Sequence, residues 1–354
     1  SPNEHPCHYL QEKDKPSLEK TLNQLKKNIN GPIRIFNFCS RDLHNCLYIF
    51  KKYFEIESIS MGVYHPYEFK YLASFNLHKK KMLAWNRKLF ENMYQKKSIF
   101  FMNKKGLEFL LGSDFILDGN EKFIPIPIKI DKRIQQDYAT KKTSKTTKVI
   151  CISRFANFKI QPVMHFVNTA RKLSNIEFTL IGHGGWEIFI RAYKKIFNIK
   201  NLTIHNNIMP DSLGEIIASH DIGFAQGTSA LEIAKFGKQV VIAPYSSLRD
   251  FLLNKKYYCG NFFSQESISL GDYDYKNSRF KSTLPEMIVA YNNESCPSEE
   301  SLKNGLQNYE SDFIFDEIHD FILNSNFMPD FYESIPKDSL ILKKVIKNLF
   351  RLFK

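Results

Sequence analysis

The sequence lacks any apolar run of the roughly 20 residues that a membrane-spanning helix needs. It also shows no N-terminal signal peptide, although the chain begins at Ser1 and not at a methionine. These two absences argue against a secreted or membrane-spanning protein. We therefore expect a cytoplasmic location.

Closely spaced cysteines are absent as well. The chain has 6 cysteines in 354 residues, and no two of them form a Cys-x-x-Cys pair. Cys39 and Cys151 lie in apolar, strand-like runs, which indicates buried side chains. We therefore expect free thiols in a reducing compartment, and neither a disulfide framework nor a zinc site.

Acidic residues are too few to balance the basic ones. The chain has 37 Asp and Glu residues and 50 Lys and Arg residues, which gives a formal net charge of +13 at pH 7. Such an excess attracts nucleotides, nucleic acids or an acidic membrane surface. No DNA- or RNA-binding module is recognisable, so we expect no nucleic-acid partner. The apolar fraction of 43% excludes a disordered chain.

Strand-like and helix-like segments alternate from about residue 17 onward, which predicts an α/β fold with parallel sheets. The polar stretch 141–147, rich in lysine and threonine, predicts a linker between an N-terminal domain (1–140) and a C-terminal domain (148–330). Residues 331–354 would form a helical tail. Strands are expected at 33–38, 59–64 and 98–102 in the first domain, and at 149–152, 178–181, 202–205, 222–225 and 240–243 in the second.

Polar and glycine-rich clusters follow the strands of the second domain. Ser153 and Arg154 come after its first strand, with Lys159 shortly beyond, and the run Gly182–Gly185 comes after the second strand. The run Gly227–Glu232 follows the fourth strand. Ligands of an open parallel sheet bind at the carboxyl ends of its strands. Fixed cations, a glycine turn and a helix start at that edge predict a pocket for a nucleoside diphosphate.

The order and spacing of these motifs resemble those of GT-B glycosyltransferases, most closely the retaining family-four (glycosyl transferases group 1) type. Ser153-Arg154 with Lys159 resembles the "GR…K" motif of that family. Residues 181–184 resemble its "hGxG" turn, 219–222 its "hADh" segment, and 227–238 its "GTSxLEAMAxGKPVV" motif. Tyr64-His65-Pro66 resembles the segment that carries a histidine at the domain cleft, and 123–128 the "hIPNGI" exit from the first domain.

This resemblance implies a fold and a reaction. The fold would consist of two Rossmann-like domains whose parallel sheets face a cleft, with a reduced N-terminal acceptor domain. A UDP-, GDP- or CMP-sugar would donate its sugar, with retention, to a glycan or lipid-linked acceptor in bacterial surface polysaccharide synthesis, such as capsule or lipopolysaccharide. No cofactor and no metal are expected, because Arg154 and Lys159 would neutralise the diphosphate. The expected catalytic residues are His65, Arg154 and Lys159, and the expected donor-binding residues are Ser153, Gly182, His183, Gly184, Gly227, Thr228, Ser229 and Glu232.

Two features depart from the family pattern. The family has two glutamates eight positions apart; Glu232 matches the second, but Phe224 stands at the position of the first. Only one helix precedes Ile33, so the N-terminal domain is short. These departures leave two alternatives open: a GT-B nucleotide-sugar 2-epimerase, for which Glu68 is the nearest extra carboxylate, and a non-catalytic nucleotide-sugar-binding relative.

Several of these residues also fit a purely structural role. Arg154 and Lys159 fit solvated surface cations, and Ser229-x-x-Glu232 is itself a capping box that would start a helix over 230–236. A carboxylate that caps the helix is less available to a ribose. His65 fits a structural histidine beside an aromatic run.

The last eighteen residues, Lys337–Lys354, form a basic amphipathic pattern. Leu342, Val345 and Leu349 belong to an apolar stripe at helical spacing. This pattern favours attachment to the anionic inner face of the plasma membrane, and the alternative is a helix packed on the protein. The expected membrane-contacting cations are Lys343, Lys347, Arg351 and Lys354.

Overall fold

The structure is a computed structural model. It describes residues 15–38, 50–64, 79–111, 119, 121–130, 146–206, 208–244, 246, 248–259, 261–263, 270 and 282–328. Contacts divide the chain into two compact units. The first consists of Ser1–Gly62, Leu72–Ile99 and Phe321–Lys354, and the second of Val63–Tyr71 and Phe100–Asp320.

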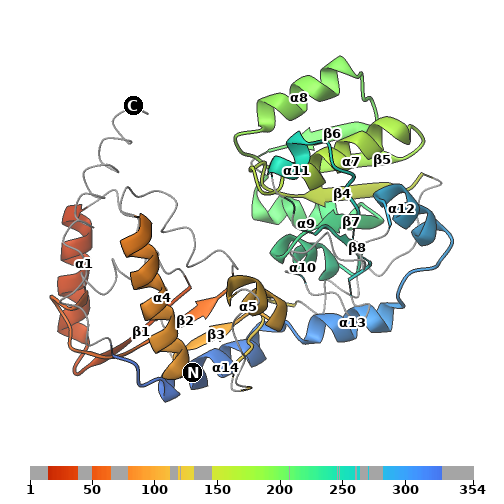
Figure 1. Ribbon diagram of the computed structural model, residues 1–354. Coiled ribbons are helices and arrows are strands. Elements are labelled where there is room, and N and C mark those ends of the chain that lie inside the picture. The colour runs from red at the N-terminus through yellow and green to blue at the C-terminus, as the bar shows by residue number, and fades with distance from the viewer. Residues whose placement is uncertain are drawn as a thin grey trace. The chain divides into compact units, whose positions relative to one another are not determined.

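A three-stranded sheet with the order β1-β2-β3 lies in the first part of the described chain (Figure 1). β1 (Ile33–Asn37) runs parallel to β2 (Ile56–Val63), and β3 (Ile99–Phe101) is fully buried. The expected strands at 33–38, 59–64 and 98–102 are therefore confirmed, with shifted ends. The helices of this part are α1 (Lys15–Asn28), α4 (Lys79–Gln95) and α5 (Lys104–Leu111).

The chain returns to the first unit at Phe321, within the last turn of α14 (Ser311–Asn324). The Arg34 guanidinium pairs with Glu57 at 2.5 Å and donates to the backbone carbonyl of Ile322 at 3.0 Å. The hydroxyl of Ser325 donates to Ser98 Oγ at 2.8 Å, and the Ile59 amide donates to the Phe327 carbonyl at 2.9 Å. These contacts connect the end of α14 and the residues that follow it to the first unit.

The second unit is built on a five-stranded parallel sheet with the order β6-β5-β4-β7-β8 (Figure 1). All five strands expected in this half of the sequence are confirmed within one residue at each end. Their bounds are β4 Lys148–Ile152, β5 Glu177–Ile181, β6 Leu202–His205, β7 Ile222–Ala225 and β8 Gln239–Ile242.

Alternate residues of these strands fill two separate cores. Val149, Cys151 and Phe224 belong to the core under α7 and α12, whereas Ile150 and Ala225 belong to the core under α10 and α13. Because successive strand side chains point to opposite faces, burial of both sets requires helices on both faces of the sheet. The described helices between β4 and α14 are α7 Ile160–Lys172, α8 Glu187–Ile196, α9 Pro210–Ala218, α10 Thr228–Ala234, α11 Leu248–Leu252, α12 Leu284–Asn292 and α13 Glu299–Gln307.

One expected helix start differs from the structure. α7 begins at Ile160, with Pro162 in its first turn. α10 begins at Thr228 and not at Ala230. Gly227, with φ 62°, adopts a backbone conformation that other residues rarely take, and it places the helix start directly after β7.

Candidate functional site

The five parallel strands of the second sheet end in one row of paired residues, which marks the carboxyl edge of the sheet. Ile152 of β4 pairs with Ile181 of β5 and with Ala225 of β7, and these rows continue to His205 and Ile242. The residues that follow lie side by side, because neighbouring strands are about 4.8 Å apart. The sheet edge therefore brings together the segments that begin at Ser153, Gly182 and Gln226.

The strand order also marks a position on that edge. From β4 the chain moves outward to β5 and β6, and then returns to place β7 on the other side of β4. A ligand crevice forms where the connections of neighbouring strands leave in opposite directions. The loop after β4, with Arg154 and Lys159, and the loop after β7, with Gly227, flank this position.

The loops after β4 and β5 pack backbone against backbone. The Phe155 amide donates to the His183 carbonyl at 2.9 Å, and the Trp186 amide donates to the Phe155 carbonyl at 3.2 Å. A Cβ atom at Gly182 would lie 1.9 Å from the Ser153 carbonyl oxygen, and one at Gly184 would lie 2.7 Å from the Phe155 oxygen. Both positions therefore require glycine for close packing, while the side chain of His183 between them is exposed.

Arg154 and Lys159 form a cationic pair without a carboxylate. Arg154 is exposed and Lys159 is half-buried at the N-cap of α7. Burial lowers the pKa of Lys159, and the neighbouring Arg154 cation lowers it further. Among the residues that the structure describes, neither side chain has an acidic partner within 4.0 Å. Within the described part of the chain, the charge of this pair is therefore not balanced by a carboxylate, which makes the pair a candidate for binding an anion.

The start of α10 does not contain the capping box. Gly227 is the N-cap residue, and no side chain bonds to the free amides of the first turn. Ser229 is the second helical residue, so it cannot cap, and Glu232 pairs instead with Lys235 at 2.5 Å. The side chain of Glu232 keeps 39% of its exposure, so the capping explanation for this carboxylate is wrong. Thr228 is exposed at the same helix start.

Phe224 does not take the place of a ligand-binding residue. It is fully buried in β7 and stacks on Phe166 with 6.1 Å between ring centroids and 9° between ring planes. Its side chain belongs to the core between the sheet and α7 and does not point into the loops at the carboxyl edge. The mismatch with the family pattern at this position is therefore a core substitution.

Gln226 is a site residue that the sequence motifs did not single out. It follows Ala225, whose partner in β4 is Ile152, so it emerges at the edge beside Ser153. Its Oε1 atom is buried and has no hydrogen-bond partner in the part of the chain that the structure describes. A buried acceptor without a partner costs about 1–3 kcal/mol, which makes it a candidate for a ligand hydroxyl. The one signal in the sequence was its place between the strand and Gly227.

Other motif residues lie at the opposite edge of the sheet. Lys238 directly precedes β8, so the Gly237-Lys238 pair, although part of the matched motif, is not at the candidate site. His220 is buried before β7, where Nε2 lies 2.7 Å from Thr179 Oγ1 and Nδ1 lies 2.6 Å from the Ile216 carbonyl oxygen. These residues have structural roles.

Some expected site residues lie outside the described residues. They are His65, Glu68, most of the linker 141–147, and the tail with Lys343, Lys347, Arg351 and Lys354. The sequence also contains Asp272-Tyr273-Asp274, an acidic pair of the kind that can hold a divalent ion, and it too lies outside them. The part of the chain that the structure describes contains no cluster of three or more His, Cys, Asp or Glu side chains suited to a metal ion. In that same part, no helix combines the length and hydropathy needed to cross a membrane.

Comparison with known proteins matches the fold but not the sequence. No family model matches the chain, and neither does any curated protein sequence. The structure is similar to HepE from Anabaena in complex with UDP-glucose, with a TM-score of 0.53, 10% identity, and coverage of 86% of this chain and 81% of HepE. A glycosyltransferase from Rickettsia africae gives a TM-score of 0.51 at 12% identity, with 89% and 83% coverage.

A third similar structure is longer than this chain. It is TarM from S. aureus in a complex that includes UDP, with a TM-score of 0.50 and 13% identity. The match covers 85% of this chain but only 58% of TarM, so the chain spans little more than half of that protein. These matches confirm the α/β architecture that the motifs predicted: the chain has the fold of GT-B glycosyltransferases.

Proposed function

We propose that the protein is a glycosyltransferase that moves a sugar from a UDP-sugar to a glycan or lipid-linked acceptor. The observation that carries this proposal is the pair Arg154 and Lys159, which lies at the switch point of the sheet and has no carboxylate partner among the described residues. The similarity to folds that hold UDP or UDP-glucose favours a UDP-sugar among the nucleotide sugars.

The cations suit the leaving group of such a reaction. Breaking the glycosidic bond of the donor moves negative charge onto the β-phosphate. Arg154 and Lys159 would bind that charge as it develops, and one well-placed donor of this kind contributes about 3–4 kcal/mol to transition-state stabilisation. Burial removes water from the Lys159 ammonium and so lowers its pKa, and a phosphate partner would stabilise the charged form.

Gln226 and Glu232, which both follow β7 in the sequence, would bind hydroxyl groups of the donor. Glu232 has one carboxylate oxygen on Lys235 and an exposed side chain, and a carboxylate accepts well from the vicinal hydroxyls of a ribose. Gln226 Oε1, buried and without a partner, would accept from a hydroxyl of the sugar or ribose. His65 is proposed at the reaction centre from its motif alone.

We further propose that the reaction retains the anomeric configuration, needs no metal, and takes place on the cytoplasmic face of the membrane during surface polysaccharide synthesis. Metal independence follows from assigning the diphosphate charge to Arg154 and Lys159. Because Asp272 and Asp274 offer a second way to neutralise that charge, activity in EDTA is the deciding measurement.

The test is turnover of radiolabelled UDP-, GDP- and CMP-sugars by the purified protein, with and without lipid-linked glycan acceptors. We expect UDP-sugar hydrolysis or transfer, a loss of about 10²-fold or more in Lys159→Ala, and unchanged activity in EDTA. Lys303→Ala, on the exposed surface of α13, is the matched control. Inversion at C2 of the free donor would identify an epimerase, and binding without turnover a non-catalytic relative; either result would refute the proposal.

A further inference from the structure

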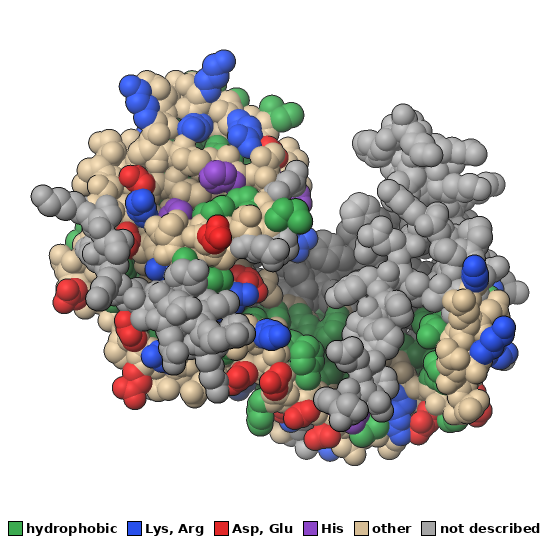
Figure 2. All heavy atoms as spheres, turned by 180° about the vertical axis from the view of Figure 1, so that it is seen from behind, with side chains coloured by type: hydrophobic (Ala, Val, Ile, Leu, Met, Phe, Trp, Pro, Cys, Tyr) green, Lys and Arg blue, Asp and Glu red, His purple; other side chains and the backbone are tan. Residues whose placement is uncertain are grey.

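The outward face of α14 combines exposed apolar side chains with a row of carboxylates. Phe313 is 71% exposed and Leu323 is 49% exposed. Asp312, Asp316 and Asp320 are exposed as well, and their i, i+4, i+8 spacing places them on one side of the helix. At about 100° per residue, Leu323 lies within this row and Phe313 lies at its border. Figure 2 shows Asp and Glu side chains close together at its lower edge, where Figure 1 places α14.

The charge of this helix is unusual for the chain. The sequence has 50 Lys and Arg residues, yet α14 contains none. Glu317 pairs with Lys122 at 2.5 Å. Asp312 and Asp316 have no Lys or Arg partner within 4.0 Å among the described residues. Like charges at i, i+4 repel each other, so a basic surface laid against this face would relieve the repulsion and cover the exposed apolar side chains.

The basic segment that ends the chain, residues 337–354, has the complementary pattern. It contains six Lys or Arg residues and one Asp. Leu342, Val345 and Leu349 belong to an apolar stripe at helical spacing, with the cations beside it. An apolar stripe flanked by cations is the chemical complement of exposed apolar residues flanked by carboxylates.

The basic segment is also long enough and close enough in the sequence to cover α14. The carbonyl of Phe327 accepts from the Ile59 amide at 2.9 Å, which fixes the chain three residues after the end of α14. Residues 325–336 separate α14 from the basic segment, and two antiparallel helices need a loop of only about 2–5 residues. The 14 residues of α14 span about 21 Å, and 18 helical residues would span about 27 Å.

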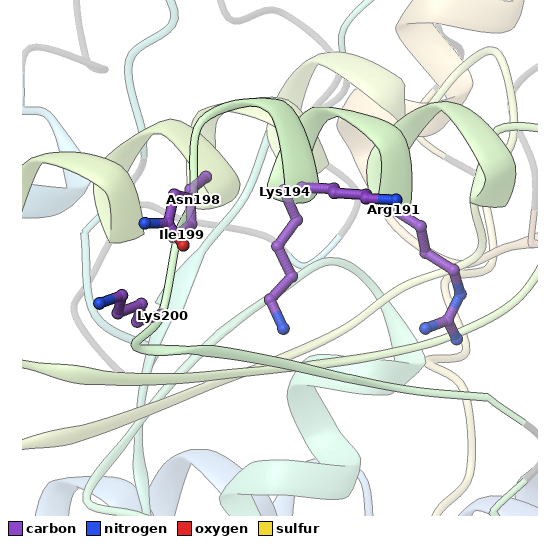
Figure 3. Close-up of a pocket in the computed structure, with 6 residues that line it drawn as sticks. Arg191, Lys194, Asn198, Ile199 and Lys200 are labelled. Atoms are coloured by element: carbon purple, nitrogen blue, oxygen red, sulfur yellow. The ribbon is translucent and has the colours of Figure 1, made fainter.

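The exposed apolar residues of α8 suit the basic segment less well. Ile188 is 84% exposed and Ile196 is 75% exposed. However, Arg191 and Lys194 of the same helix, with Lys200 beyond its end, line an open hollow of about 520 Å³ (Figure 3). A basic segment would meet like charge at this helix, so charge favours α14.

We propose that residues 337–354 pack as a helix against the outward face of α14 in the same chain. The apolar stripe of the segment would cover Phe313 and Leu323, and its cations would pair with the row of aspartates. The cations are then engaged within the chain instead of at a membrane surface. The inference uses α14 and the basic segment alone, and it holds whether or not the protein transfers a sugar.

Hydrogen exchange of the full-length protein, without lipid, tests the proposal. Helices of this length are marginal by themselves in water, so slow exchange of residues 337–354 requires that they pack on a surface. Carbodiimide cross-linking, which joins a carboxylate to a lysine amine in contact with it, then identifies that surface. A mixture of ¹⁴N- and ¹⁵N-labelled chains shows whether the linked peptides come from one chain or from two.

Two variants alter the face of α14. They are Phe313→Ser with Leu323→Ser, and Asp312→Lys with Asp316→Lys. The matched controls make the same changes at exposed residues of other helices, and thermal unfolding checks that each variant is folded. These controls are Leu252→Ser with Val289→Ser, and Glu215→Lys with Glu300→Lys.

We expect the basic segment of wild type and of both controls to exchange at least about 10-fold more slowly than an unstructured peptide. In both α14 variants the exchange should rise to within about 2-fold of the unstructured rate. Adding Lys343→Glu and Lys347→Glu to the lysine variant should restore the protection. Cross-links should join 311–324 to 337–354 within one chain.

Four results would overturn the proposal. The first is an unprotected segment in wild type, and the second is equal protection in the α14 variants, which would place the segment on another surface. The third is protection that appears only after vesicles of phosphatidylglycerol are added, which would assign the segment to a membrane. The fourth is cross-linking only between ¹⁴N and ¹⁵N chains, which would assign this face of α14 to a second copy.

Discussion

Replacing Gly182 with alanine tests whether the loops after β4 and β5 are held together as the structure places them. The added Cβ would lie 1.9 Å from the Ser153 carbonyl oxygen and 2.9 Å from the Phe155 ring. A carbon and an oxygen in contact need about 3.3 Å. The backbone after one of the two strands must therefore move by roughly 1 Å or more, because the nearest atom is main chain and not a flexible side chain.

The expected cost is about 3 kcal/mol or somewhat more, the upper range for forcing a group into a packed site. Gly185→Ala is the matched control, because a Cβ there meets no atom within 4 Å and the residue has no positive φ. Urea unfolding followed by circular dichroism measures the difference in free energy of unfolding. UDP binding by calorimetry then reports on the site, since Ser153 and Arg154 would move with the loop.

We expect Gly182→Ala to be the less stable variant by about 3 kcal/mol and to bind UDP at least 10-fold more weakly than Gly185→Ala. Equal stability of the two variants would refute the close packing of these loops. Reduced stability with unchanged UDP affinity would separate the loops from nucleotide binding and place the ligand elsewhere.

Three further predictions concern single side chains. Burial lowers the pKa of His165 to about 4, so between pH 6.5 and 4 the unfolded chain binds a proton that the folded chain does not. The free energy of unfolding should therefore decrease as the pH is lowered through this window, by up to about 3 kcal/mol. His165→Gln, which keeps an acceptor for the Leu284 amide, should flatten this pH dependence in urea titrations. Gln226→Leu should change the free energy of unfolding by no more than about 1 kcal/mol or raise it, because the variant removes a buried acceptor that lacks a partner among the described residues. The KM for the donor should rise about 10-fold, because the complex loses a hydrogen bond, and an unchanged KM would contradict this role. Glu232→Gln should weaken binding of UDP but not of a ribose-free phosphate such as pyrophosphate, and equal losses for both would exclude a ribose contact.

The second unit was largely predictable from the sequence because its local signals agree. Each strand is a short, largely apolar run, the three strands β4, β7 and β8 are buried on both faces over most of their length, and each cluster such as Ser153-Arg154 follows a strand. The parallel register then brings these clusters to one edge, because all the strands run in the same direction. The positions of Arg154, Lys159 and Gly182 could thus be inferred without a structure.

Other features depend on contacts that a linear motif does not contain. Ser229-x-x-Glu232 fits a capping box, but the positive φ of Gly227 starts the helix one residue before Ser229 and makes Gly227 the cap. Phe224 aligns with a glutamate of the family, yet strand alternation turns it into the core under α7. Gln226 has no motif, and only its buried, unpaired oxygen singles it out. Ile188, Ala192 and Ile196 of α8 have the spacing of a core-facing helix, and only the structure shows that they are exposed.

The central claim is that Arg154 and Lys159 bind the diphosphate of a nucleotide donor. Calorimetric titration of the wild-type protein, Arg154→Ala and Lys159→Ala with UDP and with uridine tests it most directly. The account predicts that wild type binds UDP much more tightly than uridine, and that each variant loses about 10-fold or more of the UDP affinity while its weak affinity for uridine is unchanged. Equal affinities for UDP and uridine, or unaltered UDP binding by both variants, would contradict the account.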